Sequence, residues 1–476
     1  YTNLIRRHFK NTRPIVLGGM EASLRRISHY DFKTNKVRRS ILFDARADVL
    51  VYGMGEKTVT ELARRLQSGE DFTDLRGICY AAAKKPEGFL ELPAHSKAAA
   101  DKEAFIEMFA GFYKNTDPVR ARGLCQLQDT RYLVCNPPQL PLSQQEIDPI
   151  HELDYRRRAH PVHADQGRVR ALDTIAFSII SHRGCYGECH FCAITALQGK
   201  TVISRSRQSI LREAESLARH PDFKGVISDV GGPTANMYEI ECRKKATHGA
   251  CIRKRCLGGR VCPELAVDHG PQIRLLKDLR KIAGIKHVFI GSGIRHDLIL
   301  ADSKNGQAYL EQIIGHHVSG QHKIAPEHSE NHLLTLMGKP DIDLTRQFIR
   351  RFRKTAARLG KKYYGRLPGM HAKGYGSIKR LLQPGNGLCP GTGPDLHPGS
   401  GHRGHAHVLD KKNMAGQKPP FRGNRPPPQT GPETNCHATG PACKAQQIQI
   451  TMDLMSVYQT ISLPSIPVIF RNRRCN

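Results

Sequence analysis

The sequence predicts an α/β protein with two units of alternating strands and helices, followed by a disordered C-terminal tail. Near the start, short apolar runs end in glycine turns at 13–19 and 48–56. From Leu172 onward, strand and helix patterns alternate, which is typical of a parallel sheet with right-handed crossovers. After Lys362 both periodicities stop. These observations together define the predicted fold class.

Residues 1–84 are predicted to form a partial Rossmann-like α/β domain. A strand at 13–19 ends in a glycine pair, and a strand at 48–56 runs into a glycine turn. Glycine turns at the carboxyl ends of parallel strands are where such sheets bind ligands. The chain begins at Tyr1 rather than methionine, with a strand pattern soon after, so we expect a further N-terminal piece in the natural protein. The following helix places Val59, Leu62, Ala63 and Leu66 on one face.

Residues 85–165 are predicted to be a linker or cap. A helical patch covers 98–112, and a proline-rich stretch at 136–141 follows it. No motif with evident chemistry occurs there.

The second unit is predicted at 166–362 and alternates strands with helices. The expected strands lie at 175–180, 225–229, 286–291 and 323–328, and the expected helices at 209–219, around 273–279, at 307–314 and at 344–359.

Three cysteines after the strand at 175–180 form the most specific motif. Cys185, Cys189 and Cys192 can ligate three corners of one 4Fe–4S cluster and leave the fourth iron open, because soft thiolates are the usual ligands of such clusters. A zinc knuckle is the alternative, but it fits poorly because only His190 could add a fourth ligand. This Cys-x3-Cys-x2-Cys spacing resembles the signature of radical SAM enzymes.

Gly231, Gly232 and Pro233 stand where the next strand ends. Glycines let backbone groups approach a ligand closely, and proline fixes the turn. The alternative is a simple turn.

An insertion at 238–265 carries Cys242, Cys251, Cys256 and Cys262. These thiols could hold a second iron–sulfur cluster or a structural zinc ion. The alternative is a surface loop with reduced, unliganded cysteines.

The composition limits the class of protein. The formal charge of +30 is spread along the chain, which favours a solvated basic surface over a nucleic-acid site. No apolar run reaches the roughly 18 residues of a membrane span. The 14 cysteines cluster at metal-ligand spacings, which indicates a reducing, cytoplasmic compartment.

The motifs together resemble the YgiQ-type radical SAM proteins over about residues 1–362. They are the segments 18–26, 36–42, 185–192, 229–238 and 323–328. The resemblance implies a radical SAM partial (β/α) barrel preceded by a cobalamin-binding-like domain. It also implies a 4Fe–4S cluster, S-adenosylmethionine bound by Gly231, Gly232 and Pro233, and an electron donor such as flavodoxin or ferredoxin. No Asp-x-His-x-x-Gly motif supplies a lower cobalt ligand, which argues against cobalamin.

The implied activity is generation of a 5′-deoxyadenosyl radical that abstracts hydrogen from an unidentified substrate. Arg295, His296, Glu327 and His328 follow strands of the expected barrel, where such folds carry their chemistry, although structural roles are the alternative. Two other functions remain open: a radical SAM enzyme that modifies RNA, and a non-enzymatic, metal-stabilised nucleic-acid-binding protein.

The C-terminal segment 363–476 departs from the resemblance. Residues 363–450 are rich in Gly, Pro and His and contain only Asp395, Asp410 and Glu433 as acids. Such a composition cannot bury enough apolar surface to offset the entropy of ordering. We expect a reading-frame shift or a natural disordered tail, and a lost frame would leave the barrel incomplete and the chain inactive.

Overall fold

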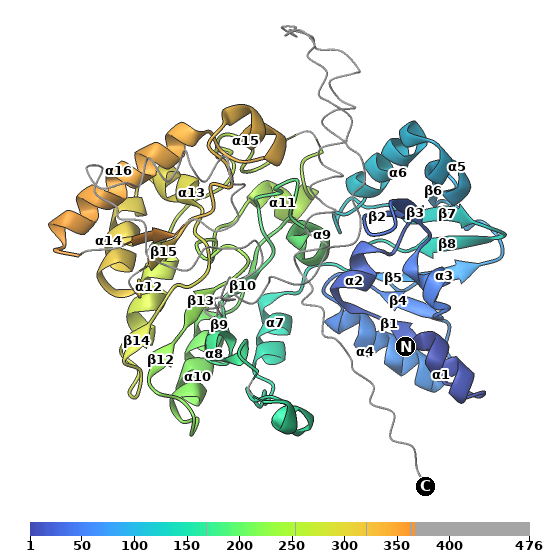
Figure 1. Cartoon of the computed structure of the whole chain (residues 1–476), viewed down its shortest axis with the longest axis horizontal. Coiled ribbons are helices and arrows are strands. Elements are labelled where there is room, and N and C mark those ends of the chain that lie inside the picture. Colours follow the sequence, from blue (N-terminus) through green and yellow to red (C-terminus); the bar gives the residue numbers. More distant parts are fainter. Residues whose placement is uncertain (168, 253, 320, 362–363, 367–476) are drawn as a thin grey trace, which may run out of the picture.

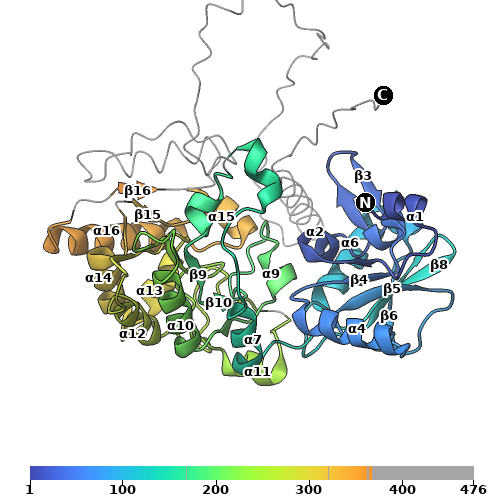
Figure 2. The same ribbon diagram turned by 90° about the horizontal axis from the view of Figure 1, so that it is seen from below.

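The computed structural model describes residues 1–361, except 168, 253 and 320, together with 364–366. Figures 1 and 2 show two units side by side, a blue N-terminal unit and a green-to-orange second unit. The mixed α/β fold predicted from the sequence is confirmed. No helix in this described part is long and apolar enough to cross a membrane.

The N-terminal unit is built on a mixed sheet. In the described residues its strand order is β1-β4-β5-β8-β7-β6, with parallel pairs only at β1–β4 and β6–β7. The antiparallel pairs were not predicted. The bounds are β1 Val16–Leu17, β4 Val49–Val51, β5 Ile78–Ala82, β6 Leu90–Leu92, β7 Leu124–Gln128 and β8 Arg131–Cys135, with a separate hairpin of β2 His29–Asp31 and β3 Lys36–Arg38.

The prediction of a linker or cap at 85–165 is wrong for its first part. β6, β7 and β8 complete the same sheet, because β8 pairs with β5 from Cys79 opposite Cys135 to Ala82 opposite Tyr132. Alternating apolar residues of β8, such as Leu133 and Cys135, face a common core. Pairing with a strand far away in the sequence therefore determines the structure here, although the neighbouring sequence is rich in proline. The helices are α1 Thr2–His8, α2 Gly19–Leu24, α3 Ile41–Ala45, α4 Glu56–Ser68, α5 His95–Ala100 and α6 Lys102–Lys114.

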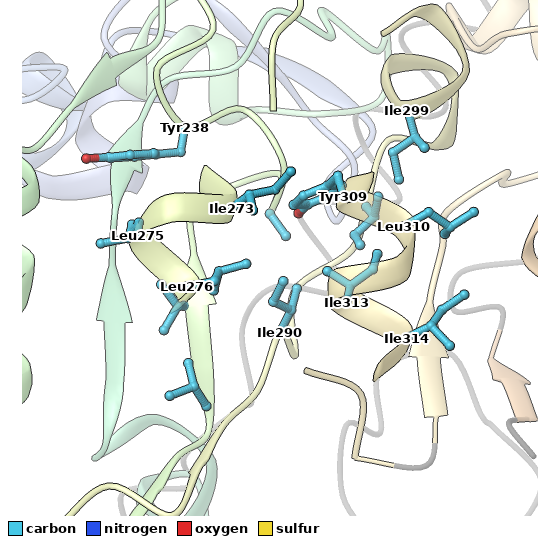
Figure 3. Packing of buried hydrophobic residues seen from close by; sticks show 14 of the residues in the cluster. Tyr238, Ile273, Leu275, Leu276, Ile290, Ile299, Tyr309, Leu310, Ile313 and Ile314 are labelled. Carbon is cyan, nitrogen blue, oxygen red and sulfur yellow. The ribbon is translucent and has the colours of Figure 1, made fainter. Parts of the chain in front are cut away.

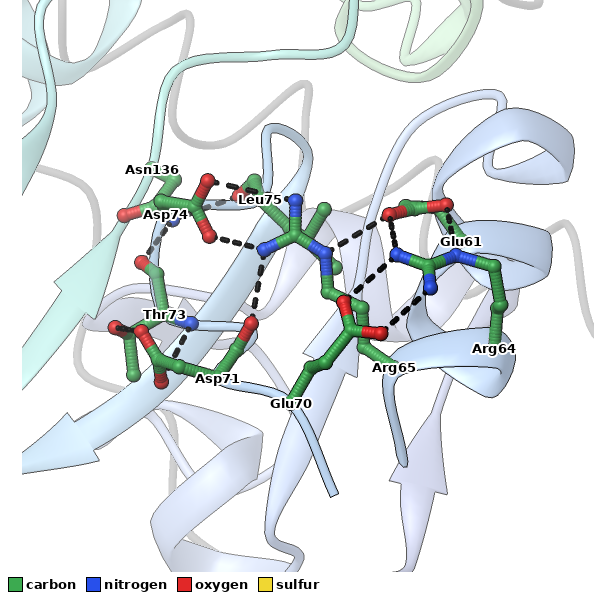
Figure 4. A network of polar contacts seen from close by, with 9 residues as sticks. All are labelled: Glu61, Arg64, Arg65, Glu70, Asp71, Thr73, Asp74, Leu75 and Asn136. Carbon is green, nitrogen blue, oxygen red and sulfur yellow. Dashed lines mark hydrogen bonds and ion pairs between the residues drawn. The ribbon is translucent and has the colours of Figure 1, made fainter. Parts of the chain in front are cut away.

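Helix α4 confirms the helix predicted after the second glycine turn. Its buried side is narrower than expected, because Leu62 is buried whereas Val59 and Ala63 are exposed. On the outer side, Arg64 and Arg65 pair with Glu61 at 2.9 Å each (Figure 4). Such exposed pairs add little stability because water screens the charges, so the helix is held mainly by its packing.

The segment between the units contains α7 Gln144–His151, a 3-10 helix at Pro161–Gln166 and α8 Leu172–Ile175. Ser143 caps α7 through a capping box with Glu146.

The second unit is an arc of parallel strands. β9 Ser178–Ile180 pairs with β13 Asp229–Gly231, and β12 Val226–Ile227 pairs with β14 His287–Val288, each in parallel. The hydrogen bond from Val230 N to Phe289 O at 3.0 Å joins these two pairs, and a parallel bridge between Ile294 and Ile324 extends the arc. An antiparallel pair, β10 His182–Arg183 with β11 Ile203–Ser204, lies beside it.

Helices cover the arc and close the core. Figure 3 shows Ile290 between Leu276 of α12 and Ile313 of α14 in this core. Burial of each such side chain contributes about 1.5–3 kcal/mol. The helices are α9 Ile194–Gln198, α10 Arg207–Ala218, α11 Arg243–His248, α12 Gly270–Leu279, α13 His296–Ala301, α14 Gly306–His316, α15 Asn331–Met337 and α16 Ile342–Arg358.

The predicted C-terminal boundary near Lys362 shifts slightly. β16 Tyr364–Arg366 pairs in parallel with β15 Gln321–Lys323, so regular structure continues past that point. The remainder of the segment predicted to be irregular lies outside the described residues.

Candidate functional site

The Cys185–Cys192 loop (hereafter the Cys loop) follows β10, which continues directly from β9. Ser181 N donates to Gly231 O at 2.7 Å, and Arg205 N donates to Ser181 O at 3.0 Å, so the chain is fixed on both sides just before the loop. Gly184 has φ +80°, and a Cβ there would lie 2.0 Å from Thr201 O. Only glycine fits this entry to the loop.

The three thiols of the loop are half-buried and lie close together. A Cβ built on Gly187 would lie 3.2 Å from Cys185 Sγ and 3.5 Å from Cys189 Sγ. Cys192 N donates to Cys189 O at 3.0 Å, which curls the chain back. Burial raises the pKa of Cys185 and raises that of Cys192 to about 12. Without a metal, Cys185 and Cys192 are therefore protonated at neutral pH and poorly nucleophilic.

The donor set fits a cluster better than a single ion. Within the described residues, no group of three or more His, Cys, Asp or Glu side chains is arranged to hold one metal ion. In an iron–sulfur cluster, each cysteine binds a different iron atom. The cysteine thiols therefore lie further apart than thiols that bind one metal ion together. Three soft sulfur donors on one curled loop therefore suit a 4Fe–4S cluster.

The Gly231–Pro233 motif touches the strand that leads into the Cys loop. A Cβ on Gly232 would lie 2.6 Å from both His182 Nε2 and His182 O. His182 Nε2 donates to Thr234 O at 2.9 Å, and Thr234 Oγ1 lies 3.5 Å from Cys185 Sγ. The motif thus lies directly against the predicted metal ligands.

Arg295 lies beside the Cys loop, at the carboxyl side of the parallel arc. Its guanidinium binds Asp297 in two hydrogen bonds, at 2.8 and 2.6 Å, and Nη1 lies 3.8 Å from Cys189 Sγ. Burial alone would raise the pKa of Asp297, but the Arg295 charge outweighs it and holds that pKa at about 2. A buried cation is therefore fixed next to one thiol.

The other three catalytic candidates have different environments. His296 Nε2 hydrogen bonds Thr345 Oγ1 of α16 at 3.0 Å, and burial lowers its pKa to about 4, so this histidine is neutral. Glu327 lies 3.4 Å from Lys339 Nζ, and burial raises the pKa of Glu327. His328 Nδ1 accepts from Glu330 N at 3.0 Å. Glu327 is linked to the Cys loop through Lys339, whose Nζ lies 5.5 Å from the Phe191 ring centroid.

A buried polar network around Glu188 was not predicted. Its carboxylate accepts from Tyr113 OH of α6 at 2.9 Å and lies 3.4 Å from Lys200 Nζ and 3.8 Å from Lys245 Nζ. Burial lowers the pKa of Lys200, although Glu188 opposes this effect. The network ties the Cys loop to the N-terminal unit and to the insertion. A charged residue inside the cysteine motif was the only sequence signal for it.

The cysteines of the insertion divide into two groups. Cys242, Cys256 and Cys262 pack in one cluster with Tyr186 and Cys185. Cys251 instead lines a surface pocket of about 440 Å³. The described residues do not preform a single-ion site, so the structure gives no support for a zinc ion held by all four. A second cluster remains a prediction.

The carboxyl edge of β4, where the expected Rossmann-like domain would bind its ligand, faces α9. A Cβ on Gly53 would lie 3.6 Å from Leu197 O, and Arg183 Nη1 donates to Glu56 Oε1 at 2.5 Å across the interface. This direct contact leaves the edge covered by the helix that follows Cys192.

Comparison with known proteins gives close relatives. Residues 1–178 match the family described as radical SAM N-terminal. The chain is 52% identical over 365 residues to a UPF0313 protein of Fusobacterium nucleatum, covering 76% of this chain and 64% of that protein. It is 48% identical over 369 residues to one of Methanocella arvoryzae, covering 76% and 60%. The chain thus spans less than two thirds of the length of these relatives.

Two solved structures match this chain at low similarity. One is the radical S-adenosylmethionine methyltransferase TsrM of Kitasatospora setae, at 14% identity and a TM-score of 0.41, covering 80% of this chain and 55% of that one. The other is the cobalamin-dependent S-adenosylmethionine radical enzyme OxsB, at 13% identity and a TM-score of 0.45, covering 82% and 42%. These low scores do not assign any residue of this chain to a role.

Proposed function

We propose, on the match of residues 1–178 to the radical SAM N-terminal family and on the similarity to the UPF0313 proteins, that this chain is a radical SAM protein that binds a 4Fe–4S cluster and S-adenosylmethionine. Cys185, Cys189 and Cys192 hold the cluster, and Gly231, Gly232 and Pro233 receive the methionine end of S-adenosylmethionine. When bound, the two cofactors supply reductive cleavage of the sulfonium and a 5′-deoxyadenosyl radical that abstracts hydrogen from substrate. The substrate is not identified.

One observation carries this proposal: the three thiols, the Gly-Gly-Pro turn and a buried guanidinium meet at one edge of the parallel arc. Thr234 contacts Cys185 at 3.5 Å, and Arg295 lies 3.8 Å from Cys189. Ligands bind at the carboxyl ends of parallel strands in such folds. Cofactor chemistry of this kind needs the protein mainly for binding, orientation and exclusion of water.

The roles of individual side chains follow from their surroundings. Arg295 places a buried positive charge 3.8 Å from Cys189 Sγ, where it would offset the negative charge of a bound cluster. Burial raises the pKa of Glu327. Its ion-pair partner Lys339 lies over the ring of Phe191 in the Cys loop. Cysteine deprotonation accompanies metal binding, so cluster assembly releases protons and is favoured at higher pH.

The proposal is tested by anaerobic reconstitution with iron and sulfide, followed by reduction in the presence of S-adenosylmethionine. We expect a visible cluster absorbance and formation of 5′-deoxyadenosine. A protein that binds zinc instead, or that forms the cluster without cleaving S-adenosylmethionine, contradicts the proposal. The same proposal includes a reducing cytoplasmic location and a flavodoxin or ferredoxin as electron donor.

Gly232→Ala is expected to weaken S-adenosylmethionine binding at least tenfold. A Cβ at this position meets the His182 backbone oxygen at 2.6 Å, so the turn must move away from β10. The measurement is a titration of S-adenosylmethionine into cluster-loaded protein. Gly293→Ala is the matched control, because a Cβ there has nothing within 4 Å. Unchanged affinity in Gly232→Ala would show that the motif is only a turn.

The insertion is expected to hold metal independently of the Cys loop. If Cys242, Cys256 and Cys262 bind a second cluster, a variant with Cys185, Cys189 and Cys192 all replaced by alanine keeps part of its iron. Iron and zinc counts on that variant decide the question. The absence of residual metal would identify the insertion cysteines as free thiols.

A further inference from the structure

The Cys-rich insertion carries an exposed basic pocket that the cofactor site does not use. Arg243, Lys244 and His248 of α11 line it together with Cys251 and with Arg120 from the loop between α6 and β7 of the N-terminal unit, around a volume of about 440 Å³. Glu264 is the single acid in the lining. Figure 1 shows α11 between the barrel strands and the N-terminal unit. We call this surface the basic pocket.

The cations of the basic pocket are available to a partner. Arg120, Arg243 and Lys244 are exposed, and none of their side chains has an ion pair or hydrogen bond within the described residues. The two sides of the pocket are in close contact, because Gly249 of the insertion approaches Asp117 of the N-terminal unit. Gly249 has φ +73°, and a Cβ there would lie 2.3 Å from Asp117 Oδ1. The positive charges therefore form one fixed surface across both units.

The basic pocket connects to the Cys loop through packed sulfur and aromatic groups. Cys251 lines the pocket, and the neighbouring Cys242, Cys256 and Cys262 pack with Tyr186 and Cys185. Two hydrogen bonds also tie the insertion to the cofactor site. Arg295 Nη2 donates to Leu257 O at 3.3 Å, and Lys245 Nζ donates to Lys200 O at 2.7 Å. Such packed contact shortens the distance an electron must cross between a partner on this surface and the Cys loop.

We propose that the basic pocket is the docking surface for an acidic one-electron donor protein that reduces the site at the Cys loop. This inference rests on the proposed function. In the transfer, the donor loses one electron and the cluster gains it, and no bond is formed or broken. Small, charged, salt-sensitive interfaces are typical of weak electron-transfer complexes, and opposite charge raises their association rate.

Nucleic acid fits this surface less well than an acidic protein. Proteins that bind single strands stack bases on exposed aromatic side chains. The segment 239–265 contains no Phe, Tyr or Trp, so the insertion offers charge without a stacking platform. The insertion also packs directly on the Cys loop, so a redox partner bound to it would lie near the cluster.

The test uses a charge-reversal variant, Arg120→Glu/Arg243→Glu/Lys244→Glu, in the full chain. The control variant Lys277→Glu/Arg350→Glu/Lys354→Glu has the same change in net charge at exposed positions on α12 and α16. Binding of an acidic FMN flavodoxin to cluster-free protein is measured at low and high salt. We expect the pocket variant to lose roughly tenfold or more in affinity at low salt, as removal of steering charges predicts. The control is expected to stay near wild type.

A second readout separates this inference from the proposed function. Cluster-loaded proteins are assayed for 5′-deoxyadenosine with flavodoxin hydroquinone and, separately, with dithionite. We expect the pocket variant to be slow with flavodoxin and normal with dithionite. Equal losses of flavodoxin binding in both variants, or none in either, would overturn the inference. Loss of binding to a single-stranded RNA probe with flavodoxin binding intact would assign the surface to nucleic acid. Failure of dithionite in every protein would refute the proposed function and leave the binding result to decide the docking surface.

Discussion

Replacing any one of Cys185, Cys189 and Cys192 by alanine is expected to remove most of the bound iron and all cleavage of S-adenosylmethionine. Each thiol holds its own corner of the cluster, and the Cys loop contains no fourth cysteine to take its place. The measurement is iron and sulfide per chain after anaerobic reconstitution, together with 5′-deoxyadenosine yield.

Cys125→Ala serves as the matched control for this prediction. Cys125 is a buried cysteine on β7, in the N-terminal sheet and outside both cysteine motifs. Its removal should leave the cluster content unchanged. A full cluster in the triple alanine variant of the Cys loop would contradict the assignment of the ligands.

Arg295→Met is expected to destabilise the protein by about 3–5 kcal/mol, the usual cost of leaving a buried charge without its partner. The carboxylate of Asp297 is almost fully buried, with 3% of its side chain exposed, and receives both of its close ion-pair hydrogen bonds from Arg295. The measurement is urea unfolding of the cluster-free protein at neutral pH. The pKa of Asp297, held at about 2, means that the stabilisation is present above the unfolded pKa near 4 and is lost as the pH falls toward 2.

The double variant Arg295→Met/Asp297→Asn is the control for this second prediction. It removes both charges, so it should recover much of the lost stability. A double variant as unstable as the single one would show that packing of the arginine, and not its charge, accounts for the loss. Since Arg295 is not a ligand, the single variant should still assemble a cluster if it folds.

Several features of the fold could be predicted because they depend on residues near one another in the chain. The helix at 342–358 repeats its apolar residues at helical spacing, and Phe348, Phe352 and Ala356 are indeed buried. The strands β12 and β14 lie within the stretches 225–229 and 286–291 where the sequence predicted strands. The strand pairs of the N-terminal sheet were missed because pairing between β5 and β8 joins residues far apart in sequence, where local patterns carry little information.

The features of the candidate site also divide into local ones, which could be predicted, and long-range contacts, which could not. By itself the sequence determined the spacing of Cys185, Cys189 and Cys192 and the position of the glycine turn, because a curled loop and a tight turn depend on a few consecutive residues. Only the tertiary structure decided that Thr234 and Arg295 meet those thiols, that His296 turns to α16, and that Glu188 joins Tyr113 and two lysines. These contacts depend on how the strands are ordered and how the two units pack. Buried charges such as Glu188 and Arg295 look like ordinary surface residues in a sequence, and only the positions of their distant partners show that they are enclosed.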